Sequence, residues 1–376
     1  MSASIVQFGT SRFLQAHADL ILSEARRSGQ DVGTVTIVET TGSAASRARI
    51  AAFDRGEPFP IRIRGLENGT IRDETRMVDG IVAGLSARTD ARALRTAFVE
   101  AGYVLSNTGD KGFALPQSPD PTLENWSSFP ELLTALLHER WSATGAPVVI
   151  MPCELISRNG DTLRSIILEL AAMRQDAAAF SDWIKARCVF VNALVDRIVS
   201  EPLAPVGAVA EPYALWALEA QPGFVPPCTH DQIQVVSDLG SIERKKLFML
   251  NLGHTLLAQR WRDYGGAPDL TVRESIADPH TIEWLDAILS GEIVPAFPAA
   301  DDAEAYWRQC KERFANPFLD HRLADIATNH EAKIERRAKG FLDWAETQIP
   351  GQSAFPRLRA AFGDFLRTAG ERRNAV

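Results

Sequence analysis

The first 240 residues alternate short apolar runs with helical segments, whereas the rest of the chain carries almost no strand signal. The run Ser4–Gly9 ends in glycine, and apolar residues follow it at helical spacing. Further runs rich in valine, isoleucine or leucine occur at 35–38, 102–106 and 147–151, and a helical pattern occupies 91–101. Strands that alternate with helices in this way predict an α/β fold with a doubly wound, mostly parallel sheet.

The segment 59–82 interrupts this alternation. Isoleucine and arginine alternate at Ile61–Arg64 like an edge strand, and Asn68-Gly69 follows as a strong hairpin signal. We therefore expect a hairpin inserted into the sheet. Cys188–Ile198 and Gln232–Val236 are two further strand candidates, separated by proline-containing loops.

From residue 241 onward the pattern is helical. The expected helices are 241–262, 279–289, 302–314, 321–344 and 354–370. A chain of 376 residues is too long for one comfortable hydrophobic core, so we expect two domains. The simplest division is an α/β domain over residues 1–239 and an all-helical C-terminal domain over residues 240–376.

Charge and cysteine usage argue against several classes of protein. The formal net charge is −8, without the basic stripe of a nucleic-acid binder. No run approaches 18 uninterrupted apolar residues, and residues 1–7 lead into the first strand without a signal segment. The four cysteines are far apart, which disfavours zinc or dithiol chemistry. We expect a cytoplasmic monomer or small homo-oligomer that takes a small-molecule substrate and has no membrane, nucleic-acid or metal partner.

The turn after the first expected strand has part of a dinucleotide-binding pattern. Gly9 is the first glycine of G-x-G-x-x-G, whereas Ser11 and Leu14 stand at the other two glycine positions. A helix that begins here would present main-chain N–H groups and its positive dipole end to a pyrophosphate. Arg12 would then contact phosphate, or else lie in solvent. The pattern is equally consistent with an ordinary strand-to-helix turn.

Glu39 closes the second expected strand, where an acidic residue accepts hydrogen bonds from an adenosine ribose diol. Its negative charge would repel a 2′-phosphate, which favours NAD over NADP. Arg47 and Arg49 lie nearby and keep NADP open, and a loop glutamate without a ligand is the plain alternative.

The stretch 244–254 carries the most informative pattern. At about 100° per residue, an α-helix places Lys246, Asn251 and His254 within an arc of about 140°. Apolar neighbours such as Leu247 and Leu250 would shield Lys246 from water and favour its neutral form, which a general base needs. The alternative is a basic helix start followed by a capped or core histidine.

The interval from Lys246 to His254 resembles the K-x4-N-x-x-H signature of the mannitol dehydrogenase superfamily, the polyol-specific long-chain dehydrogenases and reductases. Other segments agree with that family in the same order. They are Phe8-Gly9 with Phe13-Leu14, Ser106–Thr108, Pro152–Ile156 with Asn159-Gly160, Leu194–Ile198, Glu211-Pro212 with Trp216, Arg313–Phe318, His321, Asn329 and Lys333.

Within the superfamily the chain is most similar to the tagaturonate reductase (altronate oxidoreductase) branch, and it is shorter than typical members. Ser11 replaces a glycine of that branch, and Leu155 stands where many mannitol dehydrogenases have an asparagine that helps to bind the reacting oxygen. We therefore expect a different substrate contact at Leu155, with Asn251 as the main donor to that oxygen.

The resemblance implies a Rossmann-like NAD-binding domain followed by a helical substrate domain. Lys246 would take the hydroxyl proton in alcohol oxidation, or return it in ketone reduction, without a metal. Asn251 would stabilise the alkoxide-like oxygen, and His254 would hold the substrate oxygen or Lys246 in place. The nicotinamide of NAD would supply the redox chemistry.

Other positions of the family pattern are candidate binding residues. The cofactor contacts would come from Phe8, Gly9, Ser11, Arg12, Phe13, Glu39, Asn107 and Asp196, and the substrate contacts from Asn159, Arg197 and Lys333. Several of these residues have an ordinary alternative. Asn107 and Asn159 could be turn asparagines beside glycine, Asp196 and Arg197 could form a structural ion pair, and Lys333 could be a solvated lysine. His17, on the apolar face of the first helix, is expected to be a core histidine.

The reaction that these observations favour is the interconversion of altronate and tagaturonate by an NAD(H)-dependent dehydrogenase. Within the same chemistry, mannitol or arabinitol, or mannonate and fructuronate, are alternatives. A non-catalytic nucleotide-binding homologue is an alternative of another class, because the glycine pattern is incomplete.

Overall fold

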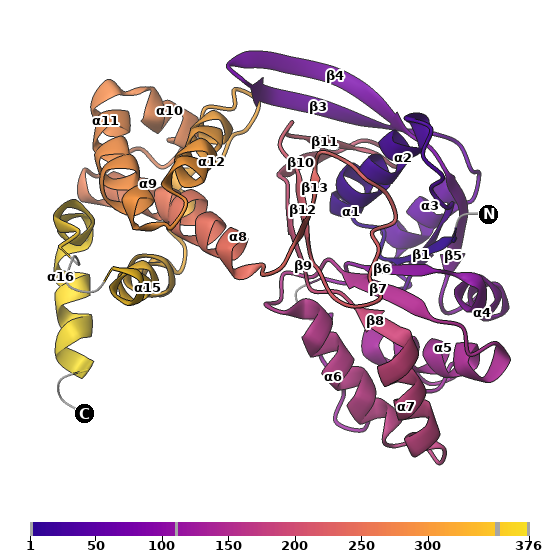
Figure 1. Cartoon of the computed structure of the whole chain (residues 1–376). Helices are drawn as coiled ribbons and strands as arrows, with labels where there is room; N and C mark the ends of the chain where they lie inside the picture. The colour runs from indigo at the N-terminus through magenta and orange to yellow at the C-terminus, as the bar shows by residue number, and fades with distance from the viewer. Residues whose placement is uncertain (1–2, 110–111, 350–353, 374–376) are drawn as a thin grey trace. The chain divides into compact units, whose positions relative to one another are not determined.

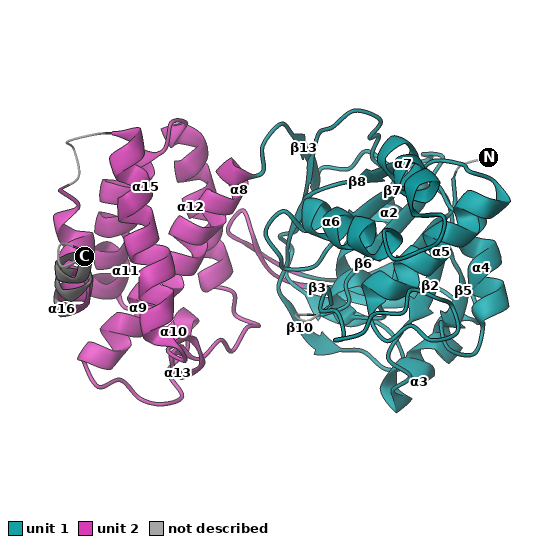
Figure 2. Ribbon diagram, turned by 90° about the horizontal axis from the view of Figure 1, so that it is seen from below, with its two compact units in different colours: residues 1–63, 73–239 teal, residues 64–72, 240–376 magenta. Residues whose placement is uncertain are grey.

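The computed structural model describes residues 3–109, 112–349 and 354–373, and it separates into two compact units (Figure 2). The first unit comprises residues 1–63 and 73–239, and the second comprises residues 64–72 and 240–376. The second unit is thus helical except for the tip of one β-hairpin.

A six-stranded parallel sheet forms the centre of the first unit (Figure 1). Its strands are β1 (Ile5–Phe8), β2 (Val35–Glu39), β5 (Ile81–Ser86), β6 (Tyr103–Ser106), β7 (Val148–Pro152) and β8 (Cys188–Phe190). The spatial order is β5-β2-β1-β6-β7-β8, and every neighbouring pair is parallel. Taken in chain order this is 3-2-1-4-5-6, the order of the Rossmann fold. The expected doubly wound sheet is confirmed.

Helices cover both faces of this sheet, because successive side chains of each strand point to opposite sides. Ile5 packs with α2 (Leu20–Arg27) and α3 (Ala44–Phe53). Val6 and Phe8 pack on the opposite side, in a second apolar cluster. The helices of that side are α4 (Ala91–Glu100), α5 (Phe129–Ala143), α6 (Asn159–Ala171) and α7 (Ala177–Arg187).

The first helix after β1 is not uniform. It consists of α1 (Arg12–Leu14), the π-helical segment η1 (Gln15–Asp19) and then α2. Leu14, Leu20 and Ile21 are fully buried along it, and His17 is buried with Nε2 2.9 Å from the carbonyl oxygen of Leu215. His17 is a core histidine, as predicted.

The predicted hairpin is present between β2 and β5. It is formed by β3 (Phe59–Glu67) and β4 (Thr70–Val78), and Asn68 and Gly69 join them with positive φ values of 53° and 72°. Two successive positive φ values are those of a tight hairpin turn. The expectation that 61–64 lies at a sheet edge was wrong, because β3 also pairs with β11 (Ala208–Ala210).

Two smaller sheets complete the first unit. One has the order β10-β11-β3-β4, where β10 is Val199–Pro202, and the other joins β13 (Ile233–Val236), β12 (Leu215–Glu219) and β9 (Ala193–Asp196). The predicted strand over 188–198 is therefore two strands, since β8 and β9 belong to different sheets. Strands β5, β10, β11 and β12 were not predicted.

The second unit is built around α9 (Leu252–Asp263), which buries residues such as Leu252, Leu256 and Leu257. Its other elements are α8 (Gly240–Lys245), η2 (Lys246–Asn251), α10 (Val272–Ala277), α11 (Pro279–Ile288), η3 (Leu289–Ile293), η4 (Val294–Ala296), α12 (Ala300–Phe314), α13 (Leu323–Ile326), α14 (His330–Ile334), η5 (Glu335–Lys339), α15 (Gly340–Gln348) and α16 (Pro356–Arg373). Within the described residues, β13 is the last strand along the chain.

Two local features of the second unit differ from the expected helices. The helix expected over 321–344 is interrupted at Asn329, whose φ of 51° is left-handed and cannot continue an α-helix. The segment η2 is π-helical and not α-helical. The hairpin tip also packs within this unit, where the Glu312 carboxylate accepts the main-chain N–H groups of Asn68 and Gly69 over 3.2 and 2.7 Å.

Candidate functional site

Gly9 occupies a position that only glycine fits. Its φ is +119°, and a Cβ atom there would lie 2.6 Å from the carbonyl oxygen of Asn107. The end of β1 and the loop after β6 are therefore in van der Waals contact at the switch point of the sheet, where the strand order reverses. A switch point at the carboxyl ends of parallel strands is where a Rossmann sheet receives a dinucleotide.

Ser11 caps the helix that follows and also connects two loops. Its Oγ accepts the N–H of Leu14 over 3.2 Å and donates to Oδ1 of Asn107 over 3.4 Å. The amide nitrogen of Asn107 donates to the carbonyl oxygen of Cys153 over 2.8 Å. Asn107 thus joins the loops after β1, β6 and β7. Arg12, beside this turn, is exposed.

A buried carboxylate supports the same edge of the sheet. Glu154 accepts the hydroxyl of Ser106 and both the N–H and the hydroxyl of Thr108, each over 3.0 Å. Burial raises the pKa of Glu154, and these hydrogen bonds act in the opposite direction. Glu154 belongs to a segment that the sequence pattern highlighted without a role. The structure assigns it the ordering of the loop that carries Asn107.

Glu39 ends β2 as expected, but its carboxylate is only 1% exposed. It accepts the hydroxyl of Ser86 over 2.5 Å and the N–H of Gly42 over 2.7 Å. The side chain is therefore bound to its own loop and to β5, and its contact with a ribose diol stays a prediction. Arg49 donates from Nε to the hydroxyl of Thr10 over 3.0 Å, next to the glycine turn.

Two aromatic residues of the predicted cofactor set point away from the turn. Phe8 is fully buried and packs against Phe98 and Phe129, with ring centroids 6.3 and 5.2 Å apart. Phe13 stacks on His17 at 4.9 Å. Their side chains thus pack on the core, because β1 is buried on both faces and Phe13 lies partly buried against the first apolar cluster. Asp196, also in that set, is buried at the end of β9 in another sheet.

The described hydrogen bonds of Asn159 and Arg197 are all made to other parts of the protein. The amide nitrogen of Asn159 donates to three carbonyl oxygens, and its oxygen accepts two N–H groups. Arg197 is buried and donates from all three nitrogens to the carbonyl oxygens of Ala16 and Glu211. These contacts give both residues a structural role, and their contact with a substrate stays a prediction.

Lys246, Asn251 and His254 lie on one continuous helix made of α8, η2 and α9. The π-helical segment begins at Lys246 and ends at Asn251. In a π-helix the hydrogen bonds run from residue i to i+5, which adds about one residue to each turn. The five residues from Lys246 to Asn251 therefore span about one turn. The expected grouping assumed α-helical geometry, and the observed π turn changes the rotation between Lys246 and Asn251. Single π turns occur frequently at functional sites.

His254 is held as a neutral imidazole. Its pKa is lowered well below 6.5 by burial first, and then by electrostatic interaction with His321, Arg313 and Arg337. The ring also bonds to the main chain of Leu250. A neutral imidazole that donates through one nitrogen can accept through the other. Gly253 lets Phe314 approach, since a Cβ at that position would lie 3.0 Å from the Phe314 ring.

Asn251 keeps its side-chain amide available. Its main-chain oxygen accepts from Thr255 and Arg337, but the side-chain amide has no hydrogen bond with any residue that the structure describes. It is half-buried and is not among the buried polar atoms that lack a partner. The amide can therefore donate to a bound oxygen, in contrast to the saturated amide of Asn159.

Two cationic residues lie in α14 and η5, and one of them contacts this helix. Lys333 donates from Nζ to the carbonyl oxygen of Ile326 over 2.7 Å, and partial burial followed by the charge of Arg337 lowers its pKa. Arg337 donates from Nη1 to the carbonyl oxygen of Asn251 over 3.0 Å. Sequence reasoning missed Arg337; its position four residues after Lys333, on the same helical face, was the available signal.

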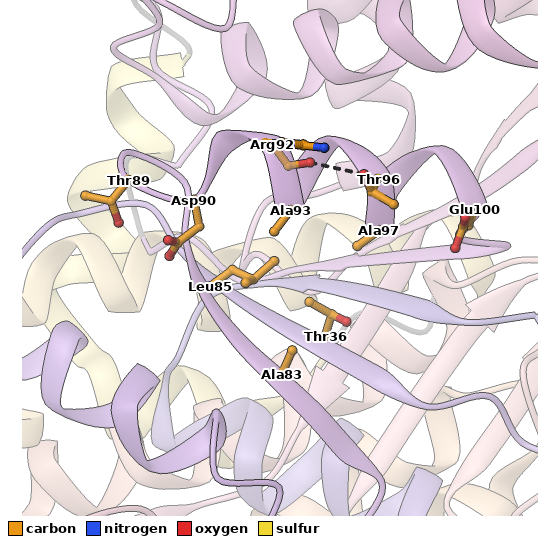
Figure 3. A pocket seen from close by; sticks show the side chains of 10 residues that line it. All are labelled: Thr36, Ala83, Leu85, Thr89, Asp90, Arg92, Ala93, Thr96, Ala97 and Glu100. Carbon is orange, nitrogen blue, oxygen red and sulfur yellow. Dashed lines mark hydrogen bonds between the residues drawn. The ribbon is translucent and has the colours of Figure 1, made fainter.

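The structure also contains a groove that none of the predicted site residues lines. It lies between α4 and the strands β2 and β5 and has a volume of 670 Å³ (Figure 3). Small side chains explain it, because Ala93 and Ala97 of α4 face Thr36 and Ala83 across the gap. The groove is separate from the glycine turn.

Neither a metal cluster nor a membrane-spanning helix is found in the part of the chain that the structure describes. No group of three or more His, Cys, Asp or Glu side chains there is placed to hold a metal ion. Of the helices described, none is both long and apolar enough to cross a membrane.

The fold and the arrangement of these residues define a class of protein. It combines a Rossmann sheet, with a glycine turn at its switch point, and a helical unit that carries lysine, asparagine and histidine on one helix. Two family models match the chain: the mannitol dehydrogenase Rossmann domain over residues 3–225 and the mannitol dehydrogenase C-terminal domain over residues 238–359. The chain belongs to the mannitol dehydrogenase family, which confirms the resemblance found in the sequence.

Curated relatives cover most of the chain. The altronate oxidoreductase of Bacillus subtilis (strain 168) is 27% identical over 380 residues, which represent 93% of this chain and 77% of that protein. The altronate oxidoreductase of Yersinia pestis is 28% identical over 362 residues, with 89% and 73% covered.

Two solved structures share the fold. A D-sorbitol dehydrogenase in substrate-free form has a TM-score of 0.80 at 22% identity, with 98% of this chain and 81% of that chain covered. Pseudomonas fluorescens mannitol 2-dehydrogenase, solved with NAD and D-mannitol, has a TM-score of 0.70 at 20% identity, with 98% and 80% covered. At these identities the likeness concerns the fold.

Proposed function

We propose that this chain is an NAD(H)-dependent oxidoreductase that interconverts a secondary alcohol of a sugar acid and the corresponding ketone, with altronate and tagaturonate as the best candidates. Membership of the mannitol dehydrogenase family supports the reaction type. The relatives named altronate oxidoreductase support the substrate. The observation that carries the proposal is one helix with a lysine, an open amide and a neutral imidazole.

The residues at the switch point fit a dinucleotide. The absence of a Cβ at Gly9 lets the end of β1 approach the Asn107 loop closely at the switch point, the place where a Rossmann sheet receives a dinucleotide. Gly9, Ser11 and Asn107 would contact the pyrophosphate and nicotinamide parts of the cofactor. Arg12, which is exposed, would bind a phosphate. Asp196 and the loop that Glu39 orders are further candidates for cofactor contact. NAD, when bound, supplies the acceptor or donor of hydride.

The residues of η2 and α9 would manage the proton and the charge on oxygen. Lys246 would remove the hydroxyl proton during oxidation and return it during reduction. The open amide of Asn251 would donate a hydrogen bond to the oxygen as negative charge develops on it. The neutral ring of His254 would accept a hydrogen bond from the substrate hydroxyl or from Lys246, and so fix the position of one of them.

A substrate panel tests this function. Purified protein is assayed with NADH or NADPH against tagaturonate, fructuronate and fructose, and with NAD⁺ or NADP⁺ against altronate, mannonate, mannitol and arabinitol. We expect the highest kcat/KM for altronate and tagaturonate with NAD(H). Turnover of neutral polyols alone would refute the sugar-acid assignment. Tight NADH binding without turnover of any of these compounds would indicate a non-catalytic homologue.

A further inference from the structure

Arg337 is fixed against the helix that carries the proposed catalytic residues. It lies in η5, and its Nη1 donates to the carbonyl oxygen of Asn251 over 3.0 Å and to the hydroxyl of Thr255 over 2.8 Å. Two hydrogen bonds from one nitrogen hold the guanidinium beside the end of η2. The stem of the side chain is half-buried, so the orientation of the charged group is restricted.

The other two nitrogens of Arg337 are not used by the protein. In the described residues, Nε and Nη2 have no hydrogen bond and no carboxylate lies within ion-pair distance, and neither atom is among the buried polar atoms that lack a partner. Both therefore remain accessible to a ligand. A guanidinium presents its N–H groups in a planar fork, which matches the two oxygens of a carboxylate.

Within the described residues, the charged side chain that shifts the pKa of Arg337 is a cation. Burial is the main cause of the lowered pKa of His254, Lys333 and His330, and the charge of Arg337 acts on each of them in the same direction. Burial lowers the pKa of Arg337 itself to about 10, and the adjacent Arg336 acts in the same direction. A half-buried cation near another cation and without a carboxylate partner destabilises the protein when no ligand is bound. A bound anion would stabilise it.

We propose that Arg337 is the residue that binds the carboxylate of the sugar-acid substrate, through its Nε and Nη2 atoms. This inference rests on the proposed function and identifies what would make the site prefer an acid to a neutral polyol. A polyol would leave the guanidinium unpaired, whereas a hexonate supplies the missing negative charge. Lys333, one helical turn before Arg337, has two further N–H donors for the same anion or for neighbouring hydroxyls.

The test compares three variants of the full-length protein. Arg337→Met removes the charge and the fork, and Arg337→Lys keeps the charge but not the fork. Arg336→Met is the matched control, because it removes an exposed cation from the neighbouring position of the same π turn. For each variant, kcat and KM are measured with altronate, with a neutral polyol and with a hexitol phosphate.

Binding is measured separately from turnover, as the rise in unfolding temperature that altronate or NADH produces. We expect Arg337→Met to raise the altronate KM at least about tenfold and to abolish the altronate-induced shift, while the NADH-induced shift persists. About tenfold corresponds to the loss of one hydrogen bond to a charged group. Arg337→Lys should fall between the wild type and Arg337→Met, and Arg336→Met should match the wild type.

Different outcomes separate this inference from the proposed function. A wild-type protein that is inert toward every hexonate refutes the proposed function, and the inference with it. Hexonate turnover that is insensitive to Arg337→Met refutes the inference alone. Equal losses with altronate and with the neutral polyol would mean that Arg337 only positions Asn251. Preference for the hexitol phosphate, lost in Arg337→Met, would replace the carboxylate by a phosphate.

Discussion

Gln7 and Asp19 form a buried polar pair beneath the glycine turn. Nε2 of Gln7 donates to Oδ2 of Asp19 over 3.3 Å, and the two side chains are 0% and 1% exposed. The remaining oxygens, Oε1 of Gln7 and Oδ1 of Asp19, have no hydrogen-bond partner among the described residues. A proton on Oδ1 would let Asp19 donate to Gln7 and would satisfy both atoms at once.

Asp19→Asn should remove a pH dependence of stability. Burial raises the pKa of folded Asp19 to about 7, whereas its ordinary value is 3.8. The neutral carboxyl therefore contributes stability that is complete below pH 4 and is lost as the pH rises through about 7. Asparagine reproduces the neutral acid in shape and in both hydrogen bonds.

We expect the unfolding temperature of the wild type to fall between pH 5 and pH 8 by several degrees more than that of Asp19→Asn. Each pKa unit is worth about 1.4 kcal/mol. Asp31→Asn is the control, since it removes an exposed carboxylate from the same unit. Parallel pH profiles for the wild type and Asp19→Asn would mean that Asp19 is ionised in the folded protein.

Gly9→Ala should impair both stability and cofactor affinity. The new Cβ would overlap the Asn107 carbonyl oxygen at 2.6 Å and would force a φ of +119° on alanine. Gly29→Ala is the matched control, because Gly29 has a φ of +89° but no atom near its Cβ position. We expect both variants to unfold at lower temperature. Only Gly9→Ala should raise the Kd for NADH, measured by fluorescence, at least about tenfold, as expected for a pyrophosphate site displaced at its first glycine.

Arg197→Met should lower stability without changing substrate affinity. The substitution leaves the carbonyl oxygens of Ala16 and Glu211 without these donors, and each buried unpaired group costs about 1–3 kcal/mol. Arg95→Met, which removes an exposed ion pair with Glu139, should change the free energy of unfolding by less than about 1 kcal/mol. A raised substrate KM in Arg197→Met, measured well below its unfolding temperature, would restore this residue to the substrate site.

The parallel, doubly wound character of the main sheet could be predicted from the sequence, because β1, β2, β6 and β7 are apolar runs that alternate with helical patterns; its edge strand β5 was not recognised. Strands of the smaller sheets were harder to recognise. β10 has the sequence Val-Ser-Glu-Pro and is largely exposed, and β12 lies between proline-rich loops. The two smaller sheets also pair strands distant in sequence, such as β3 with β11, and no local pattern indicates such pairing.

The candidate site was predictable to a different extent in each unit. Lys246, Asn251 and His254 could be proposed as a group because their spacing predicts one helix face, although the π turn of η2 changes the rotation between Lys246 and Asn251. The structural contacts of Asn159 and Arg197 could not be predicted, since they are made with carbonyl groups that the fold brings from distant parts of the sequence. Arg337 was missed for the same reason: its contact with Asn251 joins residues 86 positions apart.

Lys246→Ala should abolish turnover while leaving the fold and cofactor binding intact. Loss of general acid–base help reduces kcat by about 10²-fold or more. Lys246→Arg should be similarly impaired, because a guanidinium stays charged and cannot accept the hydroxyl proton. Lys245→Ala is the control: it removes the adjacent lysine, which pairs with Asp302 over 2.6 Å.

The measurements for these lysine variants are kcat with the best substrate of the panel, the NADH Kd and the unfolding temperature. We expect unchanged NADH affinity in all three variants and near wild-type kcat in Lys245→Ala. Small primary amines added to Lys246→Ala should restore part of the rate, since they replace the missing base. A kcat within threefold of the wild type in Lys246→Ala would exclude Lys246 as the proton-transferring group. Another residue would then have to transfer the proton beside the open amide of Asn251 and the neutral ring of His254.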